Sequence, residues 1–171
     1  MSGRLDRTQF GPSIHPHRKT EIDYRKLWSG PLDGNGRRSI YTKVTRMEGP
    51  QFLELFDFPN PTATRGRRDR SNVPAQALAL LNDPFVIDQA KYWAEQLVAE
   101  NHDSIEGRVR NMFDRALSRP PTEDEQRRFV MLILQLAEET PASAADILGD
   151  GNVWQDAAHA VFNMKELVFV R

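Results

Sequence analysis

The stretch from Arg65 to Pro84, which reads RGRRDRSNVPAQALALLNDP, divides the chain into two parts of different character. Before it the sequence is rich in Gly, Pro and Arg, and after it apolar residues recur with the period of an α-helix. The stretch ends in a sharp corner, because Pro84 keeps Asp83 out of the helical conformation and places it to cap the next helix. The sequence therefore predicts an irregular N-terminal layer followed by a helical core.

The segment 75–81 (AQALALL) is apolar on every side except at Gln76. A helix of this composition is typical of the centre of a protein, so we expect it to be buried. Ser71 or Asn72 can cap its N-terminus. Pro74 suits the first helical turn, because its missing N–H would have no partner there in any case.

Amphipathic periodicity predicts four further helices after this segment. Ser104 can cap one of them, and Thr122 and Glu125 form a capping box for another. The apolar tail 166–171 is suited to docking on the helical body. The predicted helices span 84–100, 105–118, 123–139 and 153–163.

The N-terminal half offers one candidate strand and one short helix. Segment 38–47 (RSIYTKVTRM) is rich in β-branched and aromatic residues, which indicates a strand, a short hairpin or an extended surface segment. Segment 51–58 (QFLELFDF) fits one or two helical turns. Trp28 carries a large apolar ring, so we expect the arm that contains it to pack on the body.

These elements together predict a mostly α protein. We expect a compact helical bundle or array of roughly four to six helices, with a long irregular N-terminal layer and at most a short β-hairpin. Residues 1–70 are expected to form an irregular arm rich in Arg, Gly and Pro that packs on the body. Residues 71–171 are expected to form the helical core, and the two together make one domain.

Composition excludes several kinds of chemistry. The chain has no cysteine, so disulfides, thiol catalysis and haem attachment through CxxCH are excluded within it. No apolar run approaches the roughly 20 residues of a membrane helix, and the first residues lack the apolar core of a signal peptide. We therefore expect no membrane insertion, and no cofactor or metal site in this chain.

The two halves of the chain carry opposite charge. Residues 1–75 contain 14 Lys and Arg against 8 Asp and Glu, whereas residues 76–171 contain 9 against 16. This asymmetry favours docking of one half on the other, with a basic face for an anionic partner as the alternative.

An arginine-rich cluster is the clearest candidate for binding an anion such as an acidic ligand or glycan, because guanidinium groups match phosphate and carboxylate geometry. The alternative is a purely structural role, in which salt bridges to Asp57, Asp83 and the acidic helices hold the loop in place. Nucleic acid is a disfavoured partner, because no aromatic platform interrupts the cluster and the pI is about 6.4. The candidate anion-binding residues are Arg37, Arg38, Arg65, Arg67, Arg68 and Arg70.

A second candidate set consists of polar residues in or beside the apolar segment, which we call the polar junction. Structural hydrogen bonding and capping account for most of them without a function. His15 and His17 form an HxH pair in a Pro-rich loop, which indicates an exposed loop more than a metal site. No catalytic residue is assigned, since no catalytic motif is present. The polar junction comprises Asp57, Arg68, Asn72, Gln76, Asn82 and Asp83.

Several strings, in this order and spacing, carry a family resemblance. They are FGPSIHP at 10–16, RRSIYT at 37–42, LFDFPNP at 55–61, RRDRSNVPAQALALLNDP at 67–84, RALSRPPTEDE at 115–125 and NMKELVFVR at 163–171. With them the chain, from about Gly3 to Arg171, resembles the C-terminal domain of unknown function of planctomycete cytochrome-c-domain proteins. Many relatives carry a cysteine where this chain has Arg65.

The resemblance implies a setting more than a mechanism. Such proteins are large, exported and modular, so it implies a C-terminal fragment of a parent protein in the periplasm or cell envelope. The implied partner is a neighbouring domain of the same parent, and haem c belongs to the parent and not to this chain. No catalytic residues are established for the domain, and none are carried over.

Three functions remain open at this point. The first is a non-catalytic interaction or docking domain. The second is half of an enzyme site, for polysaccharide breakdown or redox chemistry, completed by the upstream domain. The third is polyanion binding through the cluster 65–70.

Overall fold

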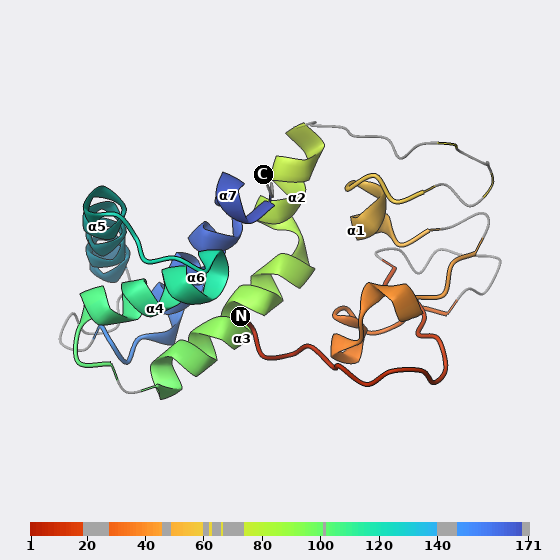
Figure 1. Cartoon of the computed structure of the whole chain (residues 1–171), viewed down its shortest axis with the longest axis horizontal. Helices are drawn as coiled ribbons and strands as arrows, with labels where there is room; N and C mark the ends of the chain where they lie inside the picture. Colours follow the sequence, from red (N-terminus) through yellow and green to blue (C-terminus); the bar gives the residue numbers. More distant parts are fainter. Residues whose placement is uncertain are drawn as a thin grey trace. The chain divides into compact units, whose positions relative to one another are not determined.

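The computed structural model shows a mostly helical protein with an irregular N-terminal region, which confirms the predicted fold class (Figure 1). No strand occurs in the described residues. The chain falls into two compact units, which we describe separately: a helical unit (1–3 and 86–171) and an irregular unit (4–85). The described residues are 1–18, 28–45, 49–59, 62, 66, 74–100, 102–139 and 147–168.

The described residues of the helical unit form five helices around one core. Helix α5 packs on α4 and α6, and α7 packs on both α4 and α6. Large side chains with no exposed surface fill the centre, including Trp93, Phe113 and Trp154. The helices are α3 (Pro84–Ala99), which begins two residues before the unit does, α4 (Ile105–Leu117), α5 (Glu123–Glu139), α6 (Gly151–Phe162) and α7 (Lys165–Val168).

Local capping explains why these helices begin where they do. The Ser104 hydroxyl accepts a hydrogen bond from the Gly107 N–H at 3.1 Å. Thr122 and Glu125 form the predicted capping box: Thr122 Oγ1 accepts from the Glu125 N–H at 3.3 Å, and Glu125 accepts from the Thr122 N–H at 2.8 Å. The starts and ends predicted for α3, α4 and α5 are thus confirmed to within one residue.

The C-terminal part of the unit differs from the prediction in two respects. Helix α6 starts two residues earlier than expected, because Asp150 caps it by accepting a hydrogen bond from the Asn152 N–H at 2.9 Å. The tail contains the short helix α7, which the sequence reading had not predicted. Among the described residues, no helix is both long enough and apolar enough to cross a membrane.

A buried arginine ties the loop before α6 to the core. Arg108 is only 2% exposed, and its Nη1 donates a hydrogen bond to the Leu148 carbonyl at 2.6 Å. Its guanidinium carbon lies 4.5 Å from the ring centre of Trp154. The indole N–H of Trp154 in turn donates to the Ile147 carbonyl at 2.8 Å. Two side chains from different helices therefore hold the same loop segment.

An ion-pair cluster joins the α4–α5 connection to α7. Arg119 donates two hydrogen bonds to the Glu125 carboxylate at 2.8 and 2.9 Å and two to Glu166 at 2.6 and 2.9 Å. The Arg119 guanidinium, together with the Thr122 hydrogen bonds, lowers the pKa of Glu125 from 4.5 to about 2. The same two carboxylates raise the pKa of Arg119. Glu125 therefore serves both the helix cap and the ion pair.

The substitution Glu125→Gln tests this cluster through its pH dependence. Glutamine can keep the capping box, so the variant mainly removes the charge. The folded-state pKa of Glu125 lies below its ordinary value of 4.5, so its stabilisation is present above that pH and is lost as the pH falls towards about 2. We expect the variant to be less stable at neutral pH, and the difference in unfolding free energy to shrink over this range. Urea unfolding followed by circular dichroism measures it, and a difference that does not change with pH would contradict the assignment.

The described residues of the irregular unit form two 3-10 turns and two helices. Its extended segments touch at two isolated parallel bridges, between Asp6 and Arg37 and between Ile14 and Thr42. At the second bridge the Ile14 N–H donates to the Tyr41 carbonyl at 2.9 Å. The elements are η1 (Gly34–Gly36), η2 (Ser39–Tyr41), α1 (Gln51–Glu54) and α2 (Pro74–Asn82).

Three expectations for this unit are wrong. Of the alternatives for segment 38–47, the continuous strand is wrong over its described residues 38–45, because residues 39–41 close into η2 instead. The ring of Trp28, which we expected to be buried, is 78% exposed. Helix α2 is not buried as a whole. Gln76 and Ala79 are its only buried residues, and Leu78 is 58% exposed. The predicted turn of helix in 51–58 and the start of α2 at Pro74 are confirmed, and its cap at 71–72 lies outside the described residues.

Candidate functional site

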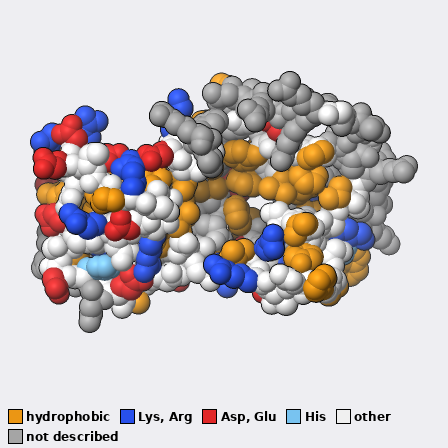
Figure 2. Space-filling model, viewed as in Figure 1, with side chains coloured by type: hydrophobic (Ala, Val, Ile, Leu, Met, Phe, Trp, Pro, Cys, Tyr) orange, Lys and Arg blue, Asp and Glu red, His pale blue; other side chains and the backbone are white. Residues whose placement is uncertain are grey.

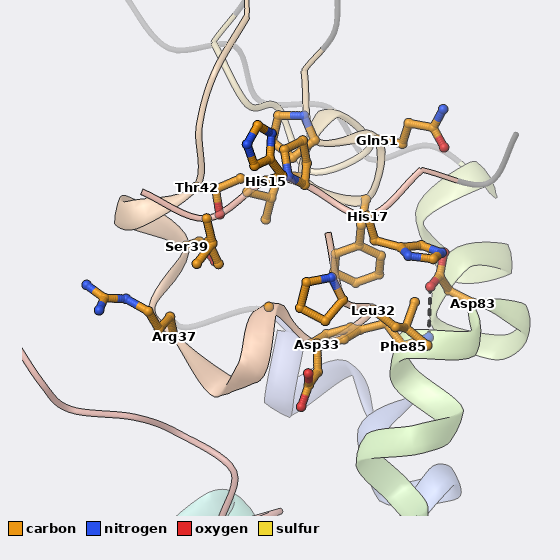
Figure 3. A pocket seen from close by; sticks show the side chains of 17 residues that line it. His15, His17, Leu32, Asp33, Arg37, Ser39, Thr42, Gln51, Asp83 and Phe85 are labelled. Carbon is orange, nitrogen blue, oxygen red and sulfur yellow. Dashed lines mark hydrogen bonds between the residues drawn. The ribbon is translucent and has the colours of Figure 1, made fainter. Parts of the chain in front are cut away.

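The irregular unit contains an open pocket of about 200 Å³, which is the candidate functional site (Figure 3). Apolar side chains from four segments form much of its wall, among them Ile14, Leu32, Phe52 and Phe85. The rings of Phe52 and Phe85 meet edge to face, with 5.4 Å between their centres. Polar side chains interrupt this wall, and they are His15, His17, Asp33, Arg37, Ser39, Thr42, Gln51 and Asp83.

Backbone hydrogen bonds between distant segments position the histidines. The Gly30 N–H donates to the Pro16 carbonyl at 3.0 Å, and His17 Nδ1 lies 3.2 Å from the Gly30 carbonyl oxygen. A β-carbon at Gly30 would collide with the His15 carbonyl, so only glycine allows this close approach. In Figure 3, His17 and Asp83 lie on one side of the pocket, opposite Ser39 and Thr42.

Asp33 is used for structure and not for chemistry in the pocket. Its Oδ1 accepts a hydrogen bond from the Asn35 N–H at 2.9 Å, which caps η1. Its Oδ2 accepts two bonds from Arg4, at 2.6 and 2.9 Å. The carboxylate points away from the pocket (Figure 3). These contacts hold the turn 33–36 that forms one edge of the pocket.

Arg37, one of the candidate anion-binding residues, also directs its head group away from the pocket (Figure 3). Its Nη2 donates to the Phe10 carbonyl at 2.6 Å, and its guanidinium carbon lies 4.2 Å from the centre of the Tyr41 ring. Arg38 is exposed. The other four residues of the set, Arg65, Arg67, Arg68 and Arg70, lie outside the described residues, so the anion site stays a prediction.

The members of the polar junction occupy separate places in the structure. Gln76 is buried and donates from Nε2 to the Leu55 carbonyl at 2.9 Å, which ties α2 to the end of α1. Asn82 is exposed and donates to the Leu78 carbonyl within α2. Asp57 has a left-handed backbone with φ of 61° just after α1. Only Asp83 lines the pocket, and Arg68 and Asn72 lie outside the described residues.

Asp83 is buried, with 4% exposure, at the corner between α2 and α3. As predicted, it caps α3: its Oδ1 accepts a hydrogen bond from the Phe85 N–H at 3.0 Å. Pro84 is the first residue of that helix. A carboxylate fixed by capping is ordered without needing a ligand.

We expect Asp83→Ala to lower the unfolding free energy by about 1–2 kcal/mol, because it removes the cap of a long helix from a buried position. Asp83→Asn should lose much less, since an asparagine oxygen can accept the same bond. Thermal unfolding of the two variants measures this. Equal losses in both would show that the charge, and not the cap, makes the contribution.

The sequence reading missed the part that His15 and His17 play in the pocket. It treated the pair as an exposed loop, which holds for His17, whereas His15 is half-buried. The available signal was the pair of prolines around them, which fixes an extended backbone. Among the described residues no group of three or more His, Cys, Asp or Glu could hold a metal ion.

The chemistry of its lining determines what the pocket can bind. Its walls offer an apolar surface with hydroxyl, amide and imidazole groups at the rim. Such a lining fits a small ligand or an inserted side chain.

Comparison with known proteins places the chain in a family but gives it no activity. Comparisons with curated proteins and with solved structures each gave no match. A family model covers residues 1–133, which include the whole irregular unit and end within α5. The string at 163–171 lies beyond this match. The chain therefore belongs to the PSD1 family, described as a protein of unknown function (DUF1553).

Proposed function

We propose that this chain is a non-catalytic docking module, which binds a protein partner through the irregular unit. Following the resemblance, the partner is a neighbouring domain of a larger exported protein of the periplasm or cell envelope, and any haem c belongs to that parent. The observation that carries the proposal is the exposed apolar face of α2.

Helix α2 has the composition of a core helix, but the burial of its residues is the reverse of what that composition predicts. Its one polar residue in the segment 75–81, Gln76, is buried, whereas Leu78 and Leu81 are 58% and 50% exposed. The two leucines are three residues apart, so they lie on the same side of the helix. Adjoining exposed apolar residues mark protein-binding surfaces where they belong to a larger patch, and this pair is the part that α2 would contribute.

Other exposed apolar residues support the same unit as the binding surface. Of the eleven large hydrophobic residues that are exposed in the described part of the chain, seven lie in the irregular unit. Figure 2 shows hydrophobic side chains gathered over α1 and α2. Interfaces are enriched in such aromatic and aliphatic anchors. The seven residues are Leu5, Phe10, Trp28, Ile40, Val44, Leu78 and Leu81.

Titration of the chain with the separately produced remainder of its parent protein tests the proposal. We expect a complex with a dissociation constant in the micromolar range or tighter, by isothermal titration calorimetry. A negative heat-capacity change should accompany binding, because apolar surface is buried. No detectable binding under conditions where both parts are folded would overturn the docking function.

A second candidate is half of an enzyme site that the parent completes, because the pocket places His15, His17 and Asp83 around one cavity. Here the full-length protein should act on acidic or sulfated glycans, and His15→Ala should reduce turnover. His102→Ala, in the helical unit, is the matched control. Unchanged turnover in the His15 variant would remove this candidate.

A further inference from the structure

Phe10 combines an unfavourable backbone with an exposed ring. Its φ is 64°, in the left-handed region, and the following Gly11 also has a positive φ of 95°. Glycine adopts this conformation readily and asparagine tolerates it, whereas an aromatic residue is a rare outlier there. Yet the Phe10 side chain is 79% exposed, the highest value among the exposed large hydrophobic residues.

Two side chains hold the backbone of Phe10 in place, whereas its ring is exposed. The Phe10 N–H donates to the Tyr41 hydroxyl at 2.9 Å, and the Phe10 carbonyl accepts from Arg37 Nη2 at 2.6 Å. Arg37 and Tyr41 also stack on each other, at 4.2 Å from guanidinium carbon to ring centre. Gly11 lies close to the Arg37 guanidinium. Two side chains from one segment therefore fix both polar groups of a single strained residue.

Folding alone does not account for phenylalanine at this position. An asparagine or glycine would make the same two backbone hydrogen bonds with less strain and without exposing a ring to water. Strained residues that the surrounding structure holds in place are concentrated at functional sites. Arg37 and Tyr41 thus act as a clamp that presents the Phe10 ring to the outside.

We infer that Phe10 is an aromatic anchor, which inserts into an apolar pocket bordered by carboxylates on the surface of a protein partner. The inference rests on the proposed docking function, because it names one contact through which the module binds. Rigidly held aromatic residues are the usual hot spots of protein interfaces, since little conformational entropy is lost when they bind.

The charges around Phe10 determine the chemistry of the partner. Arg7, Arg38 and Lys43, close in sequence to Phe10 or Tyr41, are exposed. Two acids among the described residues of these segments, Asp6 and Asp33, keep their charge, but Asp33 pairs with Arg4, which leaves the cations in excess. The surface is therefore basic, and a partner with Asp and Glu around its pocket gains attraction where a basic partner would be repelled.

The first experiment asks whether the fold needs the ring. We expect Phe10→Asn to leave the melting temperature unchanged or to raise it by a degree or more, because asparagine tolerates the left-handed backbone. Tyr41→Phe, which removes the hydroxyl that accepts the Phe10 N–H, should lower it. A drop of several degrees in the Phe10→Asn variant would overturn the inference, because the ring would then be part of the fold.

The second experiment asks what the ring touches. A photo-crosslinking benzoylphenylalanine is placed at position 10 of the full-length protein, and the same residue at position 81 serves as the matched control on α2. Illumination should link position 10 to a protein segment outside residues 1–171 that is rich in Asp and Glu, and Phe10→Asn should weaken binding of that segment roughly tenfold or more. Links only to lipid, to this chain or to a segment without acidic residues would overturn the inference.

The control separates failure of the inference from failure of the docking function. If position 81 captures a partner and position 10 does not, the docking function stands and Phe10 is not its anchor. If neither position captures a partner, the docking function itself is wrong. Raised ionic strength should weaken the position 10 complex, because the basic surface contributes to it.

Discussion

Replacing Trp154 with alanine is expected to lower the unfolding free energy of the helical unit by about 3–5 kcal/mol. The ring has no exposed surface, and its removal leaves a large cavity between the helices. It also removes the indole bond to Ile147 and the ring on which Arg108 stacks. Arg108 would then remain as a buried charge without the ring on which it stacks, which lowers the unfolding free energy further.

The matched control for this substitution is Trp28→Ala. Trp28 is 78% exposed, so the same change should alter stability by no more than about 0.5 kcal/mol. Urea unfolding followed by far-UV circular dichroism compares the two variants without depending on tryptophan fluorescence. Similar losses in both would show that Trp28 is packed in solution and that the surface described for the irregular unit is wrong.

Replacing Leu78 and Leu81 together with glutamate is expected to weaken binding to the partner domain by roughly 30-fold or more, as for a central hot spot of about 2 kcal/mol. Glutamate has nearly the helix propensity of leucine, and both positions are exposed, so α2 should remain folded. Calorimetric titration with the separately produced parent measures the loss.

Met131→Glu provides the control for this pair. Met131 is 55% exposed on α5 in the helical unit, which the proposal leaves out of the interface. Its substitution should therefore leave binding unchanged, and all variants should keep the wild-type melting temperature within a few degrees. Equal weakening by both substitutions, or none by the leucine pair, would contradict docking through α2.

The helices of the second half could be predicted because their signals are local. Ser104, Thr122 and Glu125 cap helices through backbone atoms within three residues, and no distant contact is needed to specify them. Asp83 and Pro84 specify the corner before α3 in the same way. Helix α6 begins two residues before its predicted start, although its cap at Asp150 is just as local a signal.

The candidate site could not be predicted to the same extent, because its contacts join distant segments. The pocket brings residues 14–17, 31–42, 50–53 and 83–85 together, and the bonds that do so use backbone groups that every residue possesses. Composition also led to a wrong prediction for α2, namely that the helix is buried. It correctly indicated an apolar helix, but which side of a helix faces water depends on its neighbours.

The sequence by itself determined the helical class, the helix boundaries set by caps and prolines, and the absence of thiol chemistry in a chain without cysteine. Only the tertiary structure decided that Gln76 is inside and Leu78 and Leu81 outside, that Arg108 is buried on Trp154, and that Arg37 and Tyr41 hold Phe10. The physical reason is range. Capping and helical period depend on residues a few positions apart, so they can be recognised in the sequence. Burial and long-range hydrogen bonds depend on which segments meet in space.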